Sequence, residues 1–229
     1  MFTKDDIHHV FQPIFSPKQQ KTVGFEALIR HHVFDQVHHL FRTAREQNML
    51  FLLDTRSIEK AVETFDFKND WYLFINIFPT TITHTDFPDF LENMMDKYSI
   101  QPNRIVFELN ESSSEESLWN EPMMKERITW LRQFGFLIGL DDIGSGAASI
   151  KNVIETNPDI IKLDRYFSAQ LSKSTIKQEM IASFLTFCHN QHSMLVLEGV
   201  ENQEDFFVAS QLDIPLLQGY YIGEPIRYR

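Results

Sequence analysis

A regular alternation of short apolar runs with helical stretches, along nearly the whole chain, constrains the fold more than any other feature. Eight such runs are present, and no Pro/Gly/Ser-rich linker divides them. They cover residues 11–15, 22–30, 71–77, 104–109, 136–141, 159–163, 194–200 and 216–222. Most are almost continuously apolar, which is typical of strands buried on both faces of a parallel sheet. We therefore expect a single α/β domain over residues 1–229.

The stretches between the runs have helical periodicity. Helices are expected at 41–65 (one or two), 87–98, 121–134, 149–155, 177–190 and 204–212. Alternation of about eight strands with helices favours a closed, TIM-like (β/α)8 barrel. The first two runs are separated only by residues 16–21, which are too few for a crossover helix. We therefore expect an irregular barrel with an antiparallel strand at its start.

Charge and composition exclude several classes of protein. With 21 Lys and Arg against 32 Asp and Glu, the net charge is −11, which argues against a broad face for duplex nucleic acid. No apolar run approaches the roughly 18 to 20 residues of a membrane span, and the first 15 residues lack a signal-peptide pattern. Cys188, the only cysteine, excludes an intrachain disulfide. A cytoplasmic protein with no membrane span is expected.

Polar side chains lie at or near the C-terminal end of seven of the runs. They are Glu26, Asn76, Glu108, Asp141 with Asp142, Lys162, Glu198 and Gln218. In a parallel barrel these ends meet at one rim, where active sites are built. Carboxylates gathered there would repel one another without cations, and all-oxygen ligands suit Mg²⁺ or Mn²⁺ better than zinc. Two adjacent aspartates can bridge two ions, an arrangement that activates water for phosphoester displacement.

Eight ordered motifs resemble those of the EAL family of cyclic di-GMP phosphodiesterases. EALIR at 26–30 is similar to the E-x-L-x-R signature of that family. The others are FQPI at 11–14, INIFP at 75–79, ELNE at 108–111, DDIGSG at 141–146, IKLD at 161–164, EGVE at 198–201 and QGYYIGEP at 218–225. The resemblance covers almost the whole chain.

This resemblance implies hydrolysis of cyclic di-GMP to linear 5′-pGpG with two Mg²⁺ or Mn²⁺ ions. It implies that one ion is held by Glu26, Asn76, Glu108 and Asp141, and that the second is surrounded by Asp141, Asp142 and Glu198. By the same resemblance Lys162 orients the attacking water and Glu198 is the general base. The expected substrate contacts are Gln12, Leu28, Arg30, Gln218 and Pro225. Glu111 is expected to anchor the loop 142–147. Glu201 is expected to support the site residues without contacting metal or substrate itself.

Departures from the family pattern keep a second interpretation open. The loop has Ile143 and Ser145 in place of Phe and Thr, and the segment after Arg30 looks shortened. The alternative is a catalytically weak or inactive EAL-like receptor that binds cyclic di-GMP or a protein partner. A protein whose rim only binds a partner is a third possibility. The resemblance further implies a homodimer formed near the loop 142–147, and a regulatory protein partner is possible.

Residues outside the motifs are expected to be structural. Three pairs of adjacent histidines, at 8–9, 31–32 and 38–39, are expected to be solvated rather than metal-binding, because neighbouring residues point in different directions. Cys188 lies mid-helix near phenylalanines and is expected in the core. Asp164 is expected to cap the helix that follows it.

Overall fold

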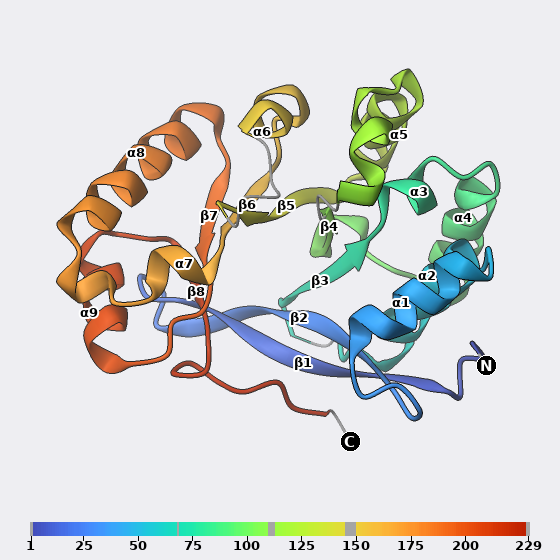
Figure 1. The fold of residues 1–229 in the computed structure, drawn as a ribbon, viewed down its shortest axis with the longest axis horizontal. Coiled ribbons are helices and arrows are strands. Elements are labelled where there is room, and N and C mark those ends of the chain that lie inside the picture. The colour runs from blue at the N-terminus through green and yellow to red at the C-terminus, as the bar shows by residue number, and fades with distance from the viewer. Residues whose placement is uncertain (1, 68, 110–112, 145–149, 228–229) are drawn as a thin grey trace.

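The computed structural model describes residues 2–67, 69–109, 113–144 and 150–227. Eight strands close into one barrel in chain order (Figure 1). They are β1 Ile7–Ser16, β2 Lys21–His31, β3 Tyr72–Ile77, β4 Ile105–Leu109, β5 Leu137–Ile143, β6 Ile160–Leu163, β7 Met194–Leu197 and β8 Leu216–Gln218. The expected α/β barrel is confirmed.

The barrel is parallel except at β1. This strand pairs antiparallel with β2 on one side and with β8 on the other, whereas β2 to β8 pair in parallel. Only residues 17–20 connect β1 to β2, so the chain has no room for a helix and turns back as a hairpin. The antiparallel start expected from the short gap is confirmed.

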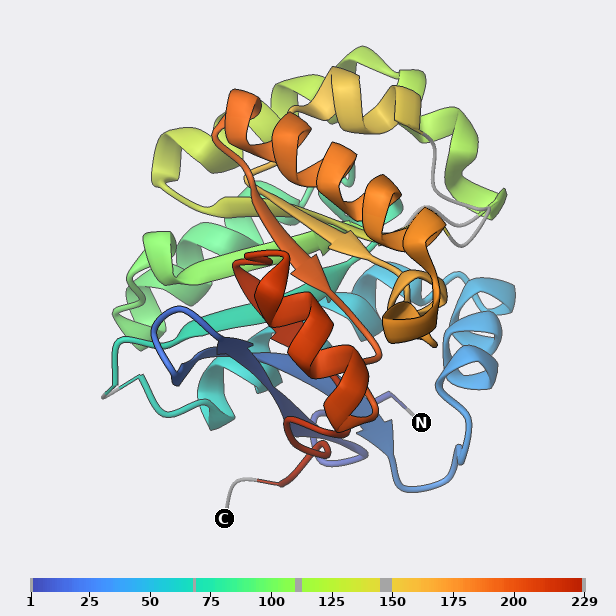
Figure 2. The same cartoon turned by 90° about the vertical axis from the view of Figure 1, so that its left-hand side faces the viewer.

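Helices form an outer ring around the strands (Figures 1 and 2). They are α1 Val37–Glu46, α2 Leu50–Thr64, α3 Pro79–Ile82, α4 Phe87–Tyr98, α5 Pro122–Phe134, α6 Ile150–Thr156, α7 Arg165–Ser168, α8 Thr175–Gln191 and α9 Gln203–Gln211. The expected segment 41–65 is two helices. The single turns α3 and α7 are too short for their periodicity to be seen in the sequence. Within the described residues, no helix is both long and apolar enough to span a bilayer.

Two strands end earlier than their apolar runs. The runs at 194–200 and 216–222 were expected to be extended throughout, but β7 ends at Leu197 and β8 at Gln218. Gly199 has φ +67° and Gly219 has φ +155°, so the backbone leaves the extended conformation just beyond Glu198 and Gln218. A Cβ at Gly219 would lie 2.2 Å from the Val200 carbonyl oxygen, which only glycine avoids.

Apolar side chains fill the barrel below its C-terminal rim. The interior cluster is formed by Ile14, Val23, Phe74, Val106, Ile160, Val196 and Leu216. A larger cluster lies between the strands and the helices and includes Cys188, which is 3% exposed as expected. A packed floor leaves the polar residues at the strand ends as the next layer, at the rim where loops can enclose a ligand.

The β1–β2 hairpin is longer than the barrel. Parallel pairing of β2 with β3 covers only Gly24 to Ala27, whereas β2 continues to His31 opposite Ile7 of β1. The two strands therefore extend beyond the rim as a two-stranded ribbon (Figure 1). This ribbon forms a wall on one side of the C-terminal end of the barrel.

Candidate active site

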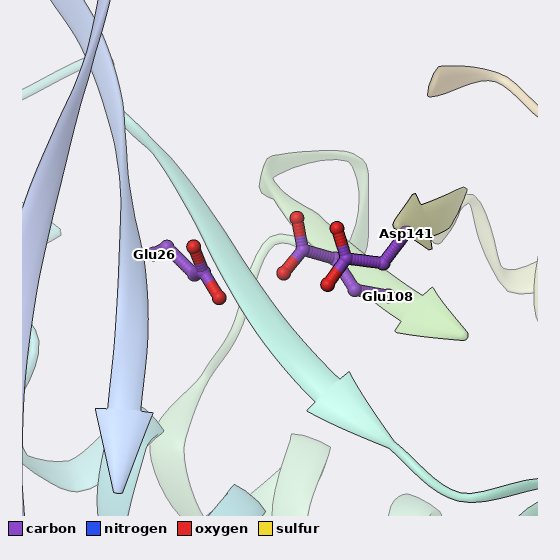
Figure 3. Close-up of side chains that lie close together, drawn as sticks. All are labelled: Glu26, Glu108 and Asp141. Carbon is purple, nitrogen blue, oxygen red and sulfur yellow. The ribbon is translucent and has the colours of Figure 1, made fainter. Parts of the chain in front are cut away.

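Acidic side chains from β2, β4 and β5, and from the residue that follows β7, meet inside the C-terminal rim. One carboxylate oxygen each of Glu26, Glu108 and Asp141 lies within 4.8 Å of the others (Figure 3). A second group with the same spacing is formed by Asp141, Asp142 and Glu198. Asp141 belongs to both groups. The structure thus brings together the five carboxylates that were expected to surround two ions, and it makes Asp141 a member of both groups.

Lys162 lies at the centre of this cluster. Its ammonium nitrogen Nζ is 2.7 Å from Glu198 Oε1, 2.9 Å from Glu108 Oε1, 3.1 Å from Asp141 Oδ1 and 3.3 Å from Glu26 Oε2. The side chain is fully buried. Because one ammonium faces four carboxylates, the site carries an excess of negative charge wherever the carboxylates are ionised.

The pKa values of the acids respond to this excess. Burial raises the pKa of Asp141 to about 6 and that of Glu198 to about 8, although Lys162 acts in the opposite direction. Burial also raises the pKa of Glu108 well above its ordinary value. Burial would raise the pKa of Glu26 too, but Lys162 and two side-chain amides lower it below the ordinary value. The site therefore favours binding of a cation, which would offset its excess negative charge.

Amide side chains hold Glu26 in place. Asn76 Nδ2 donates to Glu26 Oε1 at 3.0 Å, and Gln218 Nε2 donates to Glu26 Oε2 at 2.7 Å. Gln218 Nε2 also lies 3.2 Å from Gln12 Oε1, and Gln12 Nε2 donates to the Gly223 carbonyl at 3.3 Å. Two donors on one carboxylate fix its orientation, so Glu26 presents defined oxygen positions to the interior of the rim.

The donor set fits hard divalent cations. All the ligating atoms are oxygens, and Glu108 Oε2 is buried yet accepts no hydrogen bond from any residue that the structure describes. Five ionised carboxylates and one ammonium carry −5 + 1 = −4, which two divalent cations would neutralise. A buried acceptor without a donor is costly unless a ligand completes it. Mg²⁺ or Mn²⁺ matches these oxygens better than zinc does.

A distortion of β5 lets neighbouring aspartates serve one site. Successive residues of a regular strand point to opposite faces, so Asp141 and Asp142 could not otherwise share ligands. The pairing of β5 with β6 shifts register between Leu140 and Ile143, and Asp142 has φ +57°, in the left-handed region. Aspartate tolerates this conformation better than most residues. The bulge turns Asp142 toward the group that contains Glu198.

A pocket of about 560 Å³ adjoins the acidic cluster. It lies between the β2 and β3 ends and the helices α1 and α2, and its lining includes Glu26, Leu28, Arg30 and Asn76. Most of the exposed wall is apolar, with Phe41 among the aromatic side chains. An apolar pocket that opens onto convergent polar groups is typical of a ligand site.

One wall of this pocket depends on residues that no sequence motif indicated. The buried Glu115, in the 3₁₀ helix Ser113–Asn120, forms an ion pair with Arg45 of α1 at 2.5 Å and accepts from Thr80 Oγ1 at 2.9 Å. Arg45 also stacks over the Phe78 ring at 4.9 Å. These contacts tie the chain after β4 to the pocket wall. Glu115 lies in an acidic, serine-rich stretch that resembles an ordinary loop, so no local sequence pattern indicated that it would support the pocket wall.

The other residues expected at the site lie in different parts of the structure. Arg30 is half-buried in the pocket lining and donates to the Ile29 carbonyl at 2.8 Å. Pro225 is half-buried beside the strand pair that joins the C-terminal segment to β1. Glu201 is 54% exposed and lies 3.5 Å from Arg165, so the structure does not bring it to the acidic cluster. Glu111 and residues 145–147 of the expected loop lie outside the described residues.

The histidine pairs were only partly predicted. His9 and His31 were expected to be solvated, yet both are buried, and His9 Nε2 lies 3.1 Å from Ser57 Oγ. The prediction is wrong for these two because a strand turns alternate side chains to opposite faces, so one residue of the pair 8–9 and one of the pair 31–32 is removed from solvent. Asp164 caps α7 by accepting from the Tyr166 N–H at 2.8 Å, as expected.

Comparisons with known proteins agree with this geometry. The chain is 30% identical over 151 residues to the cyclic di-GMP phosphodiesterase PdeF of Escherichia coli K12, which is 66% of this chain and 20% of that protein. It is 27% identical over 225 residues to the biofilm architecture maintenance protein MbaA of Vibrio cholerae, covering 94% of this chain and 28% of that protein. The chain thus spans less than a third of either relative.

Solved structures share the fold. The manganese and cyclic di-GMP complex of Klebsiella pneumoniae BlrP1 at pH 9.0 superposes with TM-score 0.86 at 23% identity, over 96% of this chain and 56% of that one. A standalone EAL protein from Vibrio cholerae O395, with cyclic di-GMP bound, gives TM-score 0.85 at 24% identity over 96% and 92%. The EAL domain profile matches residues 1–225. The chain therefore belongs to the EAL domain family.

Proposed function

We propose that this chain is a metal-dependent phosphodiesterase that hydrolyses cyclic di-GMP to linear 5′-pGpG, as one EAL domain over residues 1–229. The observation that supports this proposal best is the pair of oxygen-ligand groups that share Asp141 around the buried Lys162. Relatives named as cyclic di-GMP phosphodiesterases, and the Klebsiella pneumoniae BlrP1 structures that contain cyclic di-GMP with manganese or calcium, support the substrate and the cations.

Two Mg²⁺ or Mn²⁺ ions are the proposed cofactors. Glu26, Asn76, Glu108 and Asp141 would hold one, and Asp141, Asp142 and Glu198 the other. Bound there, the ions would neutralise the non-bridging phosphate oxygens and lower the pKa of the attacking water. Gln218 keeps Glu26 oriented for this role through its 2.7 Å hydrogen bond.

The residues of the chain carry out the proton transfer and the positioning. Glu198, which directly follows β7 beside Lys162, is the proposed acceptor of the proton of the attacking water. Lys162, 2.7 Å from Glu198, holds the water and stabilises the negative charge that develops on the phosphate. The new bond joins the water oxygen to phosphorus, and the bond from phosphorus to the 3′-oxygen breaks. The proton that Glu198 takes from the water balances the one that the departing 3′-oxygen gains, which leaves a 5′-phosphate and a 3′-hydroxyl.

The other expected contacts concern the substrate. Arg30 and Leu28 line the apolar pocket, which is large enough for a planar base, while Gln12 and Pro225 lie along β1 and the C-terminal segment. We propose that these residues bind the dinucleotide. Homodimer formation, a regulatory protein partner and a cytoplasmic location stay predictions.

Hydrolysis of cyclic di-GMP tests the proposal. Purified wild type should form 5′-pGpG with Mg²⁺ or Mn²⁺, measured by liquid chromatography, and Glu26→Ala should lose at least about 100-fold in turnover. Glu92→Ala, which removes an exposed acid from α4, is the matched control and should keep wild-type activity. If wild type binds cyclic di-GMP in calorimetry but forms no product, the receptor alternative replaces the enzyme. If it neither binds nor hydrolyses, both interpretations fail.

A further inference from the structure

The ribbon that extends beyond the barrel has a face directed to the site. In β1 the side chains of Ile7, His9 and Phe11 are buried on the outer side, so the alternate residues point the other way. Gln12 belongs to the alternate set, and it turns inward to reach Gln218. Residues that follow this alternation outward along β1 therefore face the space above the acidic cluster.

Two cross-strand pairs continue this inner face. Val10 pairs with Leu28, and His8 pairs with Arg30. Directly paired residues share a face of the ribbon, so His8 and Arg30 lie on the wall that Leu28 begins. Arg30 and Leu28 also line the 560 Å³ pocket, which makes this wall continuous with the candidate active site.

Further basic groups join the same wall. The His32 ring stacks on the His8 ring with centroids 5.2 Å apart. The C-terminal segment pairs with β1 through two hydrogen bonds between Phe11 and Ile226, of 2.7 and 3.0 Å, and this pairing brings Arg227 level with Val10. Burial lowers the pKa of His8, and the nearby charges of Arg227, His32 and Arg30 lower it further. Four groups that carry or accept positive charge are therefore close together.

Among the described residues, these groups have no acidic partner. Within the part of the chain that the structure describes, no carboxylate forms an ion pair with His8, Arg30, His32 or Arg227. This is unusual in a protein of net charge −11, where acids outnumber Lys and Arg by 32 to 21. An unneutralised group of like charges costs free energy and is characteristic of a surface that binds an anion. We name these four residues the ribbon basic strip.

We propose that the ribbon basic strip binds the second phosphate of the cyclic dinucleotide, the one that is not attacked, with His8, His32 and Arg227 as specificity-determining residues beside the expected Arg30. This inference rests on the proposed function. Arg30 lies four positions after Glu26 along β2, about 13 Å at 3.3 Å per residue. Because the Arg30 side chain can extend back toward the rim, a dinucleotide can reach from the acidic cluster to the ribbon basic strip, whereas a single phosphate group cannot.

The strip would select for ligands with two phosphates. A substrate with one phosphodiester engages only the acidic cluster, and it gains nothing from the ribbon. Cyclic di-GMP engages both and gains charge-assisted hydrogen bonds from the guanidinium donors, together with hydrogen bonds from imidazole N–H groups. Removal of a strip residue should therefore raise KM for cyclic di-GMP more than it lowers kcat, because the strip does not touch the reacting phosphate.

The experiment compares two substrates in variants of the strip and in a control variant elsewhere on the hairpin. Arg227→Glu and His8→Asn are the strip variants, and Lys18→Glu, at the opposite end of the same hairpin, is the control. The substrates are cyclic di-GMP and thymidine 5′-monophosphate p-nitrophenyl ester, which has a single phosphodiester. The ratio of kcat/KM for the first to kcat/KM for the second should fall about tenfold in Arg227→Glu and less in His8→Asn, and should not change in Lys18→Glu.

Two results would overturn the inference. One is an equal loss on both substrates, which would assign Arg227 a general structural role, and the other is an unchanged ratio. If wild type hydrolyses neither substrate, the proposed function fails, and calorimetric binding of cyclic di-GMP then tests the strip by itself. In that case equal affinities of wild type and Arg227→Glu would reject it, and an affinity about tenfold weaker in Arg227→Glu would support it.

Discussion

The ammonium of Lys162 lies 2.7 Å from Oε1 of Glu198; the lysine is fully buried, and the glutamate side chain is 17% exposed. The lysine comes from β6 and the glutamate follows β7, so neighbouring strands bring a proton acceptor and a permanent cation together. This contact links stability and chemistry at the site, because the ammonium that offsets part of the negative charge of four acids is also in contact with the proposed general base.

Replacing Lys162 by alanine should separate binding from turnover. We expect Lys162→Ala to lower turnover of cyclic di-GMP by about 100-fold or more, since a group that stabilises charge developing in the transition state contributes this much, while dinucleotide affinity changes only a few-fold. Without metal, the variant should lose about 3–5 kcal/mol of unfolding free energy, because buried carboxylates lose their counter-charge. Steady-state kinetics, calorimetry and urea denaturation measure the three quantities.

Lys173→Ala, which removes an exposed lysine from the turn after α7, is the control for Lys162→Ala. It should behave as wild type in all three measurements. Full turnover in Lys162→Ala would contradict the role given to this lysine, even if stability fell as expected.

Divalent cations should stabilise the folded protein. At a concentration 100 times the dissociation constant, Mg²⁺ or Mn²⁺ should add about 2.7 kcal/mol, which for a chain of this size raises Tm by about 5 to 10 °C. Thermal unfolding followed by circular dichroism measures the shift, and EDTA should reverse it. In Asp141→Asn, where both ligand groups lose their shared carboxylate, the shift should be absent or much smaller. A full shift in that variant would contradict the assigned ligands.

Stability should fall with acid because of His9. Burial lowers the pKa of this imidazole from 6.5 to about 3, so the folded state holds it neutral while the unfolded chain takes up a proton below pH 6.5. The stability that it contributes is complete above pH 6.5 and is lost as the pH falls toward 3, by about 1.4 kcal/mol per pH unit. Urea denaturation at several pH values should show a smaller loss between pH 6.5 and 4.5 for His9→Leu than for wild type.

The exposed His189 provides the control for this pH effect. His189→Leu should follow the wild-type pH dependence, because this side chain lies on the exposed surface of α8 and not in the core. Parallel curves for wild type and His9→Leu would show that His9 is not held neutral in the fold.

Some features of the site follow from local sequence and some do not. Glu26, Glu108 and Lys162 could be predicted because each stands near the end of a continuous apolar run, where parallel strands bring their ends to one rim. Glu115 could not, because its partner Arg45 is 70 residues earlier in the chain, and no local pattern specifies that α1 and the 3₁₀ helix after β4 will meet.

The sequence by itself determined the barrel, its antiparallel start and the set of polar residues at the rim, because hydrophobic periodicity and gap length act locally along the chain. Only the tertiary structure decided which of those residues lie close enough together to bind the same ion. The bulge that turns Asp142 inward depends on the register between β5 and β6. The strip from His8 to Arg227 depends on the C-terminal segment returning to β1. Such contacts join distant parts of the chain, and the closure of the barrel fixes them.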